Sequence, residues 1–386
     1  MRHRFAEALE ERRAQHRLRT LRPLEPGKPG YVIRDGRELL DLSSNDYLGL
    51  ARHPELARRA GEWAQRYGTG SRASRLVSGT LAPHREIEER VAAWKGTEAA
   101  LLFATGWQAN AALFPALLKL EPGAAVFADW LVHASIHHGV AAARTRHTGY
   151  RHNDLAQLDE LLAASADAPA RIVATESVFS MDGDRTDVAA LVALCRKRDA
   201  LCVVDEAHAT GVLGNRGAGL TAGLADKPDI VMGTFSKALG GFGAYIAASR
   251  DICDYLANVA SGFVYTTAPP PPVLGAMDAA LNLVPDMDGE RAHVQALADR
   301  LRSGLRASGY DTGPSDTQIV PVLIGSEADA LAASDALEEA GVLAVAIRPP
   351  TVPEGESRIR FSLSAVHTEA QVDRVLETMA GMRCAA

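Results

Sequence analysis

The chain has 386 residues, of which 47% are hydrophobic and 23% are charged, and its formal net charge is -7. This composition is typical of a globular enzyme, and the length predicts two or three lobes. The negative charge balance argues against a general nucleic-acid binder. No apolar run reaches the roughly 20 residues that a membrane span needs, so no membrane association is expected.

The cysteines and the N-terminus indicate the compartment. No CxxC spacing occurs among the four cysteines, Cys195, Cys202, Cys253 and Cys384. Free thiols in a reducing compartment are the simplest explanation. The N-terminus has no apolar run of the secretory type, and its arginines are interspersed with glutamates, unlike a mitochondrial transit peptide. We therefore expect a cytoplasmic protein.

The first 45 residues are expected to form an N-terminal arm. Residues 1 to about 20 have a charged helical pattern that ends before Pro23. A hairpin with its turn at Asp35-Gly36 follows, and then a polar turn at residues 43–50. Further along, the loop at residues 67–75 is rich in small residues and is typical of a connector or of a segment that closes over a site.

A large α/β domain is expected over residues 46–280. Short apolar runs alternate with helical patterns, and these runs predict strands at residues 99–103, 124–129, 171–176, 201–206, 230–232 and 244–248. Nearly continuous apolar strands are buried on both faces, which favours a mostly parallel central sheet with helices on both sides.

The stiff segment from Thr266 to Pro272 is expected to mark a boundary, because proline fixes φ. Residues 281–386 are then expected to form a smaller α+β C-terminal domain. Its predicted strands and helices lie at residues 319–324, 357–363, 327–340 and 368–382.

Polar residues follow four of the strands predicted in the large domain. They are Gly106-Trp107, residues 176–180, residues 205–208 and residues 234–237. Ligands of such sheets bind beyond the carboxyl ends of the strands. The sequence therefore predicts one shared pocket.

The segment Thr234-Phe235-Ser236-Lys237-Ala238-Leu239-Gly240-Gly241 places a lysine among small and apolar residues. Desolvation lowers the pKa of a lysine and makes its amine nucleophilic toward a carbonyl. Neighbouring hydroxyls and glycine amides can hold a phosphate. The combination indicates a Schiff base with pyridoxal phosphate (PLP). The alternative is a lysine at a strand end with its amine in water.

Asp205-Glu206-Ala207-His208 follows a predicted buried strand. A carboxylate there can keep a pyridine nitrogen protonated, and His208 can reach the ring hydroxyl. The same four letters occur in helicases, but the phosphate-binding loop that a helicase requires is missing from the sequence.

Three further features have less specific patterns. His133, His137 and His138 lack a partner at metal-ligand spacing, so no metal is expected. His133 is then a capping or packed residue, or it stacks on an aromatic cofactor. The pair Gly106-Trp107 opens a helix whose first amides can bind phosphate.

Arg358 and Arg360 lie on a predicted strand and face opposite sides. One of them can bind a substrate carboxylate, and the other is expected at the surface.

Taken together, these motifs resemble the α-oxoamine synthases, a branch of the fold-type I PLP enzymes. The resemblance spans nearly the whole chain and rests on residues 43–50, 179–184, 205–208, 234–237 and 347–353. Residues 347–353 look most like the branch that makes a biotin precursor. That branch condenses L-alanine with a pimeloyl thioester and releases carbon dioxide.

The resemblance implies a set of roles around the cofactor. Lys237 would carry PLP and move the α-proton, Asp205 would pair with the ring nitrogen, His208 would contact the ring hydroxyl, and His133 would stack on the ring. Cofactor oxygens and phosphate would be held by Ser180, Thr234, Gly106 and Trp107, and, across a homodimer interface, by Thr266 and Thr267.

Substrate residues are implied in the same way. Asn45 and Arg360 would hold the amino-acid carboxylate, and Arg19 and Thr351 would contact the acyl group, which arrives on coenzyme A or on an acyl carrier protein. Two departures from the family pattern are Trp107 and Arg72-Ala73. The rivals within the family, such as 2-amino-3-ketobutyrate ligase, use glycine or serine and other acyl chains. A catalytically silent binding protein is the rival of another class.

Overall fold

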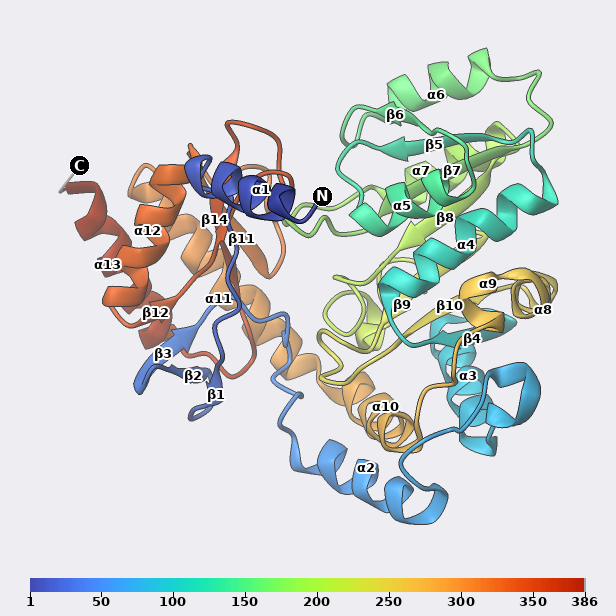
Figure 1. Ribbon diagram of the computed structural model, residues 1–386, viewed down its shortest axis with the longest axis horizontal. Coiled ribbons are helices and arrows are strands. Elements are labelled where there is room, and N and C mark those ends of the chain that lie inside the picture. Colours follow the sequence, from blue (N-terminus) through green and yellow to red (C-terminus); the bar gives the residue numbers. More distant parts are fainter. Residues whose placement is uncertain (385–386) are drawn as a thin grey trace. The chain divides into compact units, whose positions relative to one another are not determined.

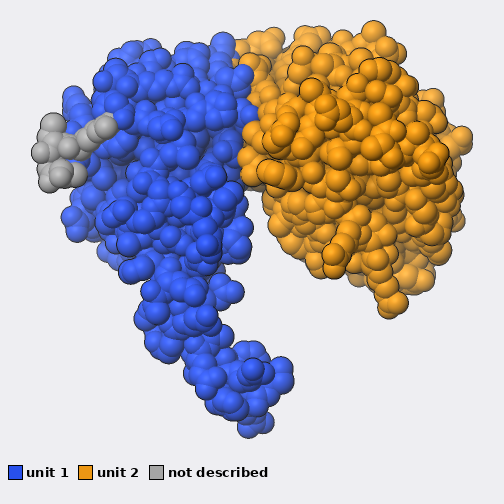
Figure 2. All heavy atoms as spheres, turned by 90° about the horizontal axis from the view of Figure 1, so that it is seen from above, with its two compact units in different colours: residues 1–49, 180–184, 292–386 blue, residues 50–179, 185–291 orange. Residues whose placement is uncertain are grey.

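The structure is a computed structural model that describes residues 1–384 and divides into two compact units (Figure 2). Unit 1 comprises residues 1–49, residues 180–184 and the C-terminal part from residue 292. Unit 2 comprises residues 50–179 and 185–291. The boundary expected at residue 280 falls inside helix α10 (Pro271–Leu283), and the N-terminal arm belongs to the same unit as the C-terminal part.

Unit 2 is built on a seven-stranded sheet (Figure 1). Its strands, in spatial order, are β4 (Ala99–Phe103), β10 (Ala244–Ala248), β9 (Ile230–Thr234), β8 (Leu201–Asp205), β7 (Arg171–Glu176), β5 (Ala125–Asp129) and β6 (Thr148–Tyr150). All are parallel except β10, which runs antiparallel to both of its neighbours. The fold-type I α/β class with a mostly parallel sheet is confirmed, and only β6 was missed in the sequence.

Both faces of this sheet are covered by helices, as the apolar strands require. Val126 and Ala128 of β5 pack with the apolar residues of α4 and α5, whereas Phe127 packs with those of α6 and α7. The helices of unit 2 are α2 (Pro54–Tyr67), α3 (Ala82–Lys95), α4 (Gly106–Leu120), α5 (Ala134–Ala142), α6 (Leu155–Ala164), α7 (Val188–Lys197), α8 (Arg250–Val259), α9 (Ser261–Val264) and α10. Shorter turns are η1 (Arg75–Gly79), η2 (Asn215–Gly217) and η3 (Val284–Asp286).

Unit 1 contains two small sheets with a shared apolar core. The first has the order β1 (Glu25–Pro26), β2 (Tyr31–Arg34), β3 (Arg37–Asp41), β12 (Val342–Leu343), and the second has the order β11 (Ile319–Gly325), β14 (Ser357–Ser362), β13 (Ala346–Ile347). Its helices are α1 (His3–Ala14), most of α11 (Asp288–Ala307), α12 (Glu327–Glu339) and α13 (Glu369–Cys384).

The N-terminal helix is shorter than expected from the charge pattern. It ends at Ala14, because His16 adopts a positive φ of 55° and Arg17 forms an ion pair with Glu327, 2.7 Å away. The hairpin predicted at Asp35-Gly36 is present as β2 and β3.

Two observations bear on the environment of the protein. Among the described residues, no helix is both long and apolar enough to cross a membrane. Cys195, Cys202 and Cys253 are buried free thiols, and the side chain of Cys384 lies outside the described part of the structure.

Candidate active site

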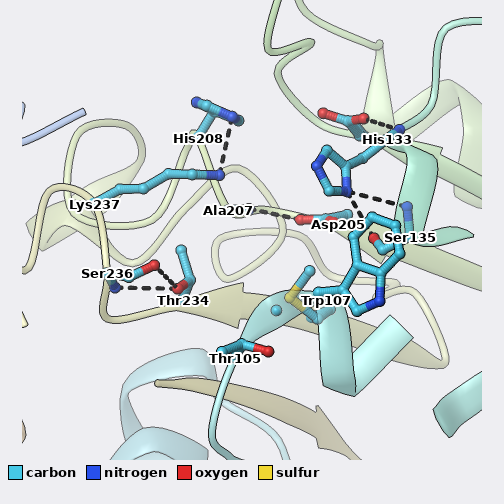
Figure 3. Close-up of a pocket in the computed structure, with 13 residues that line it drawn as sticks. Thr105, Trp107, His133, Ser135, Asp205, Ala207, His208, Thr234, Ser236 and Lys237 are labelled. Carbon is cyan, nitrogen blue, oxygen red and sulfur yellow. Dashed lines mark hydrogen bonds between the residues drawn. The ribbon is translucent and has the colours of Figure 1, made fainter. Parts of the chain in front are cut away.

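The loops that follow five strands of unit 2 enclose a cavity of about 230 Å³ (Figure 3). Its lining includes Thr105, Gly106, Trp107, His133, Ser135, Glu176, Asp205, Ala207, His208, Met232, Thr234, Ser236 and Lys237. Strands β5, β7, β8 and β9 are parallel, and β4 runs the same way as β9, so their carboxyl ends share one edge. The shared pocket expected from the strand ends is therefore present.

Lys237 lies in a tight turn directly after β9. The turn is closed by two backbone hydrogen bonds, from Gly240 N–H to Lys237 O and from Gly241 N–H to Phe235 O, each 2.8 Å long. Lys237 is half-buried, and its neighbour Ala238 is fully buried. Lys237 Nζ lies 2.9 Å from His208 Nε2, and both side chains reach into the cavity (Figure 3). The amine is thus placed in a cavity, beside the ring of His208, rather than on the open surface.

Asp205 closes β8 and is 4% exposed. Its Oδ1 accepts a hydrogen bond of 2.8 Å from Ala207 N–H, and its Oδ2 accepts one of 3.0 Å from Asn110 Nδ2. Both oxygens therefore have fixed donors, and the carboxylate plane is held in one orientation. Asp205 lines the same cavity as Lys237, so one ligand can contact both the carboxylate and the amine.

His133 caps the N-terminus of α5, because its Nδ1 accepts a hydrogen bond from Ser135 N–H at 3.2 Å. The capping role considered from the sequence is therefore present, and the ring also lines the cavity. Burial is the main cause that lowers the pKa of His133; Asp205 acts in the opposite sense and Lys237 in the same one. The neutral ring is thus favoured.

Glu176 lies at the end of β7 and accepts a hydrogen bond from His133 N–H. Burial, and then the charge of Asp205, raise the pKa of Glu176 well above its ordinary value. A buried carboxyl beside a second carboxylate favours its neutral form. Asp205 can then carry the negative charge of this cavity.

The other end of the cavity is rich in hydrogen-bond donors. Helix α4 begins at Gly106, as expected for the pair Gly106-Trp107, and Thr105 caps it by accepting a hydrogen bond from Gln108 N–H at 3.0 Å. The first amides of a helix lack partners within the helix and attract anions. Thr234 Oγ1 lies 2.7 Å from Ser236 Oγ on the neighbouring turn. PLP needs an amine, a carboxylate and donors for its phosphate. This cavity offers Lys237, Asp205, and the hydroxyls and helix amides at this end.

The residues predicted for the substrate carboxylate meet in unit 1. Arg360 on β14 is 6% exposed and donates through Nη2 to Asn45 Oδ1 at 3.1 Å and through Nε to the Ser180 carbonyl at 2.5 Å. Tyr47, which the sequence did not single out, also accepts from Nη2 at 3.3 Å. Asn45 and Arg360 thus lie together, whereas Ser180, which was predicted to bind a cofactor oxygen, contacts Arg360 through its carbonyl and does not line the cavity.

The expectation that Arg358 lies at the surface is wrong. Arg358 is 1% exposed, and its Nη1 donates to Asp182 Oδ1 at 2.6 Å. All six residues of β14 are buried, so both faces of the strand are covered, and the ion pair with Asp182 makes the burial of Arg358 tolerable.

The two residues predicted to contact the acyl group also meet in unit 1. Arg19 Nη2 donates to Thr351 Oγ1 at 3.0 Å and to the Arg348 carbonyl at 3.4 Å. Both Arg19 and Thr351 are exposed, so they are accessible to a ligand.

Thr266 and Thr267 do not line the cavity of their own chain. Thr267 forms a bridge with Ser74, and the carbonyl of the following Pro269 accepts a hydrogen bond of 2.7 Å from Ser71 Oγ. Their predicted role across a dimer interface stays a prediction.

The sequence analysis also missed Thr105 and Ser135, which line the cavity, and Asn110, which contacts Asp205. Asn110 alone gave a usable signal, because it is a single amide in the apolar run from Ala109 to Leu118. A buried polar residue in such a run needs a hydrogen-bond partner, and that partner is often functional.

Residues 37–379 match the family described as aminotransferase class I and II. The chain is 56% identical over 382 residues to 8-amino-7-oxononanoate synthase from Gluconacetobacter diazotrophicus, covering 97% of this chain and 96% of the relative.

Two solved structures are similar to this fold. One is a serine palmitoyltransferase from S. paucimobilis with PLP and myriocin bound, with TM-score 0.91 and 28% identity, covering 99% of this chain and 97% of that one. The other is 8-amino-7-oxononanoate synthase from Francisella tularensis, with TM-score 0.78 and 26% identity, covering 90% of this chain and 98% of that one.

The chain belongs to the aminotransferase class I and II family. It is a fold-type I enzyme that depends on PLP, as the resemblance had implied.

Proposed function

We propose that the protein catalyses the condensation of L-alanine with a pimeloyl thioester, which yields 8-amino-7-oxononanoate, carbon dioxide and a free thiol. The observation that carries this proposal is the 56% identity, over nearly the full length of both chains, to a relative named for that activity. The cavity with Lys237, Asp205 and His208 on adjoining strand ends supports it, because a binding protein has no need of this constellation.

The cofactor supplies an electron sink for the carbanion that forms at the alanine Cα. Lys237 is the residue that would hold PLP covalently, and its amine would take and return the Cα proton. Asp205 would keep the ring nitrogen protonated, His208 would bind the ring hydroxyl, and His133 would cover a ring face. Together these side chains would hold the ring in one orientation.

The remaining cofactor contacts follow the predicted roles. The amides of Gly106 and Trp107 at the start of α4 would bind the phosphate, with Ser180 and Thr234 on other cofactor oxygens. We place Thr266 and Thr267 at the phosphate of a second subunit, so that the active form is a homodimer with shared sites.

The substrates would be held by arginines. Arg360, fixed by Asn45 and Tyr47, offers its guanidinium to the alanine carboxylate, and this clamp orients the Cα–H bond. Arg19 and Thr351 would meet the pimeloyl group, whether it arrives on coenzyme A or on an acyl carrier protein. The reaction would take place in the cytoplasm, where free thiols such as Cys202 persist.

A thiol-release assay tests the proposal. Alanine, glycine and serine are crossed against pimeloyl, acetyl, succinyl and palmitoyl thioesters, and release should be fastest for alanine with pimeloyl. Faster release with glycine and acetyl would instead identify a 2-amino-3-ketobutyrate ligase. Lys237→Ala serves as the control, because it should lose both turnover and the visible absorbance of the bound cofactor.

A further inference from the structure

Helix α4 contains one buried amide whose place no catalytic role explains. Asn110 is 1% exposed and lies among Ala109, Ala112 and Leu113, which are also buried. It does not line the cavity. An uncompensated amide in such surroundings costs about 1–3 kcal/mol, so its hydrogen bonds must justify its presence.

Both hydrogen bonds of this amide lead to residues of the active site. Nδ2 donates to Asp205 Oδ2 at 3.0 Å and to Ser135 Oγ at 2.9 Å. An ionised carboxylate only accepts hydrogen bonds, so the NH2 end of the amide must face Asp205. The orientation of Asn110 is thereby fixed by chemistry.

The second hydrogen bond connects Asn110 to His133. Ser135 Oγ lies 2.7 Å from His133 Nδ1, which also accepts Ser135 N–H. With Nδ1 as an acceptor, the Ser135 hydroxyl donates to it and can accept from Asn110. One amide therefore links the carboxylate of Asp205 to the ring of His133, although these lie on different loops.

We propose that Asn110 is a positioning residue that sets the carboxylate plane of Asp205 and the ring of His133 for the cofactor. An amide suits this task because it donates without carrying charge. A lysine or arginine would neutralise the negative charge that Asp205 has to offer a pyridine nitrogen. An apolar residue would leave Asp205 Oδ2 without this donor. The proposal rests on the proposed role of Asp205.

The first test removes both hydrogen bonds with an apolar side chain that has the same branching at Cγ. In Asn110→Leu, PLP affinity should fall about 10-fold, since hydrogen bonds to charged groups are worth about that much. The value of kcat should fall by at least about 10-fold, and KM for alanine should stay nearly unchanged because Arg360 sets it. PLP affinity is measured by absorbance titration of the apoprotein, which is independent of turnover.

The second test uses a side chain that can donate only when protonated. In Asn110→Asp the introduced carboxylate repels Asp205, but its neutral form can donate to it. The ratio of kcat for Asn110→Asp to kcat for Asn110→Leu should therefore rise as the pH falls. Asp205, His133, Glu176, His208 and Lys237 are present in both variants, so the ratio removes the pH dependence that the two variants share and leaves the effect of the introduced carboxyl on this cluster.

Controls separate positioning from general damage. Tyr255→Phe removes a hydrogen bond of 2.9 Å to the Ala116 carbonyl of the same helix, far from the cavity lining. It should lower the melting temperature of the apoprotein and leave the absorbance spectrum unchanged. If Asn110→Leu behaves like Tyr255→Phe, or if the pH ratio is flat, the proposal is wrong.

A last variant separates this proposal from those on which it depends. Asp205→Asn should change the cofactor spectrum and its pH dependence. If it does and Asn110→Leu does not, only the Asn110 proposal fails. If Asp205→Asn has no effect on the spectrum, the proposed roles of both Asp205 and Asn110 are wrong. The thiol-release assay tests the substrates independently of these two residues.

Discussion

The buried ion pair between Lys95 and Glu206 gives the sharpest stability prediction. Both side chains are 0% exposed, and Lys95 Nζ also donates to the Ala218 carbonyl at 2.5 Å. Burial acts to lower the pKa of Lys95, but the attraction of Glu206 and Tyr245 outweighs it and leaves the pKa raised. The folded protein thus holds the lysine in its charged form, and this contribution is lost only as the pH rises past about 10.4.

In Lys95→Met the carboxylate of Glu206 loses its cation inside the protein. It keeps three donors, which are the N–H groups of Leu220 and Thr221 and the Thr221 hydroxyl. Breaking a buried pair by removing one partner costs about 3–5 kcal/mol. For a unit of about 240 residues this corresponds to a drop of roughly 10 °C in melting temperature.

The assay is thermal unfolding of the apoprotein at pH 7, followed by circular dichroism. The double variant Lys95→Met with Glu206→Gln should recover part of the loss, because the amide has no charge to leave unpaired. A drop of less than 2 °C in Lys95→Met, or a double variant no more stable than the single one, would refute the reasoning.

Three further predictions concern other parts of the chain. Gly240 has φ +65°, and an added Cβ would lie 2.3 Å from Leu50 C. Gly240→Ala should therefore lower the free energy of unfolding by at least about 2 kcal/mol and weaken PLP binding. Gly36 has φ +76° but open space around it, so Gly36→Ala should cost only about 1 kcal/mol of stability in thermal melts. Arg360→Lys keeps the positive charge but loses the planar guanidinium that can bind a carboxylate through two nitrogens. In steady-state assays KM for alanine should rise about 10-fold or more. An unchanged KM would mean that Arg360 does not bind the carboxylate. Burial lowers the pKa of His367 to about 4, so from about pH 6.5 downward the unfolded chain binds the extra proton. The free energy of unfolding should therefore fall by up to about 3 kcal/mol as the pH approaches 4, and His367→Gln should flatten this loss in urea titrations; an equal slope in both proteins would contradict it.

The parallel sheet and its pocket could be predicted because local patterns determine them. An apolar run of five residues between helical segments is buried on both faces wherever it occurs, and strands such as β4 and β8 were found in the sequence almost to the residue. Since parallel strands end at one edge, residues as distant as Trp107 and Lys237 could be assigned to one pocket.

Contacts between residues far apart in the sequence could not be predicted from local patterns. Arg358 looked like a surface residue because its burial depends on Asp182, which lies 176 positions away. Strand β6, of only three residues, has too short a pattern to recognise. The N-terminal arm could not be assigned to its unit either, because β3 pairs with β12, some 300 residues later.

The sequence by itself determined the sheet, the lysine turn after β9 and the acidic end of β8, because each depends on neighbouring residues and on a fixed strand period. Only the tertiary structure decided which amide holds Asp205 and what neutralises Arg358. Hydrogen bonds and ion pairs form between atoms a few ångströms apart, and chain folding alone brings such distant residues to that distance.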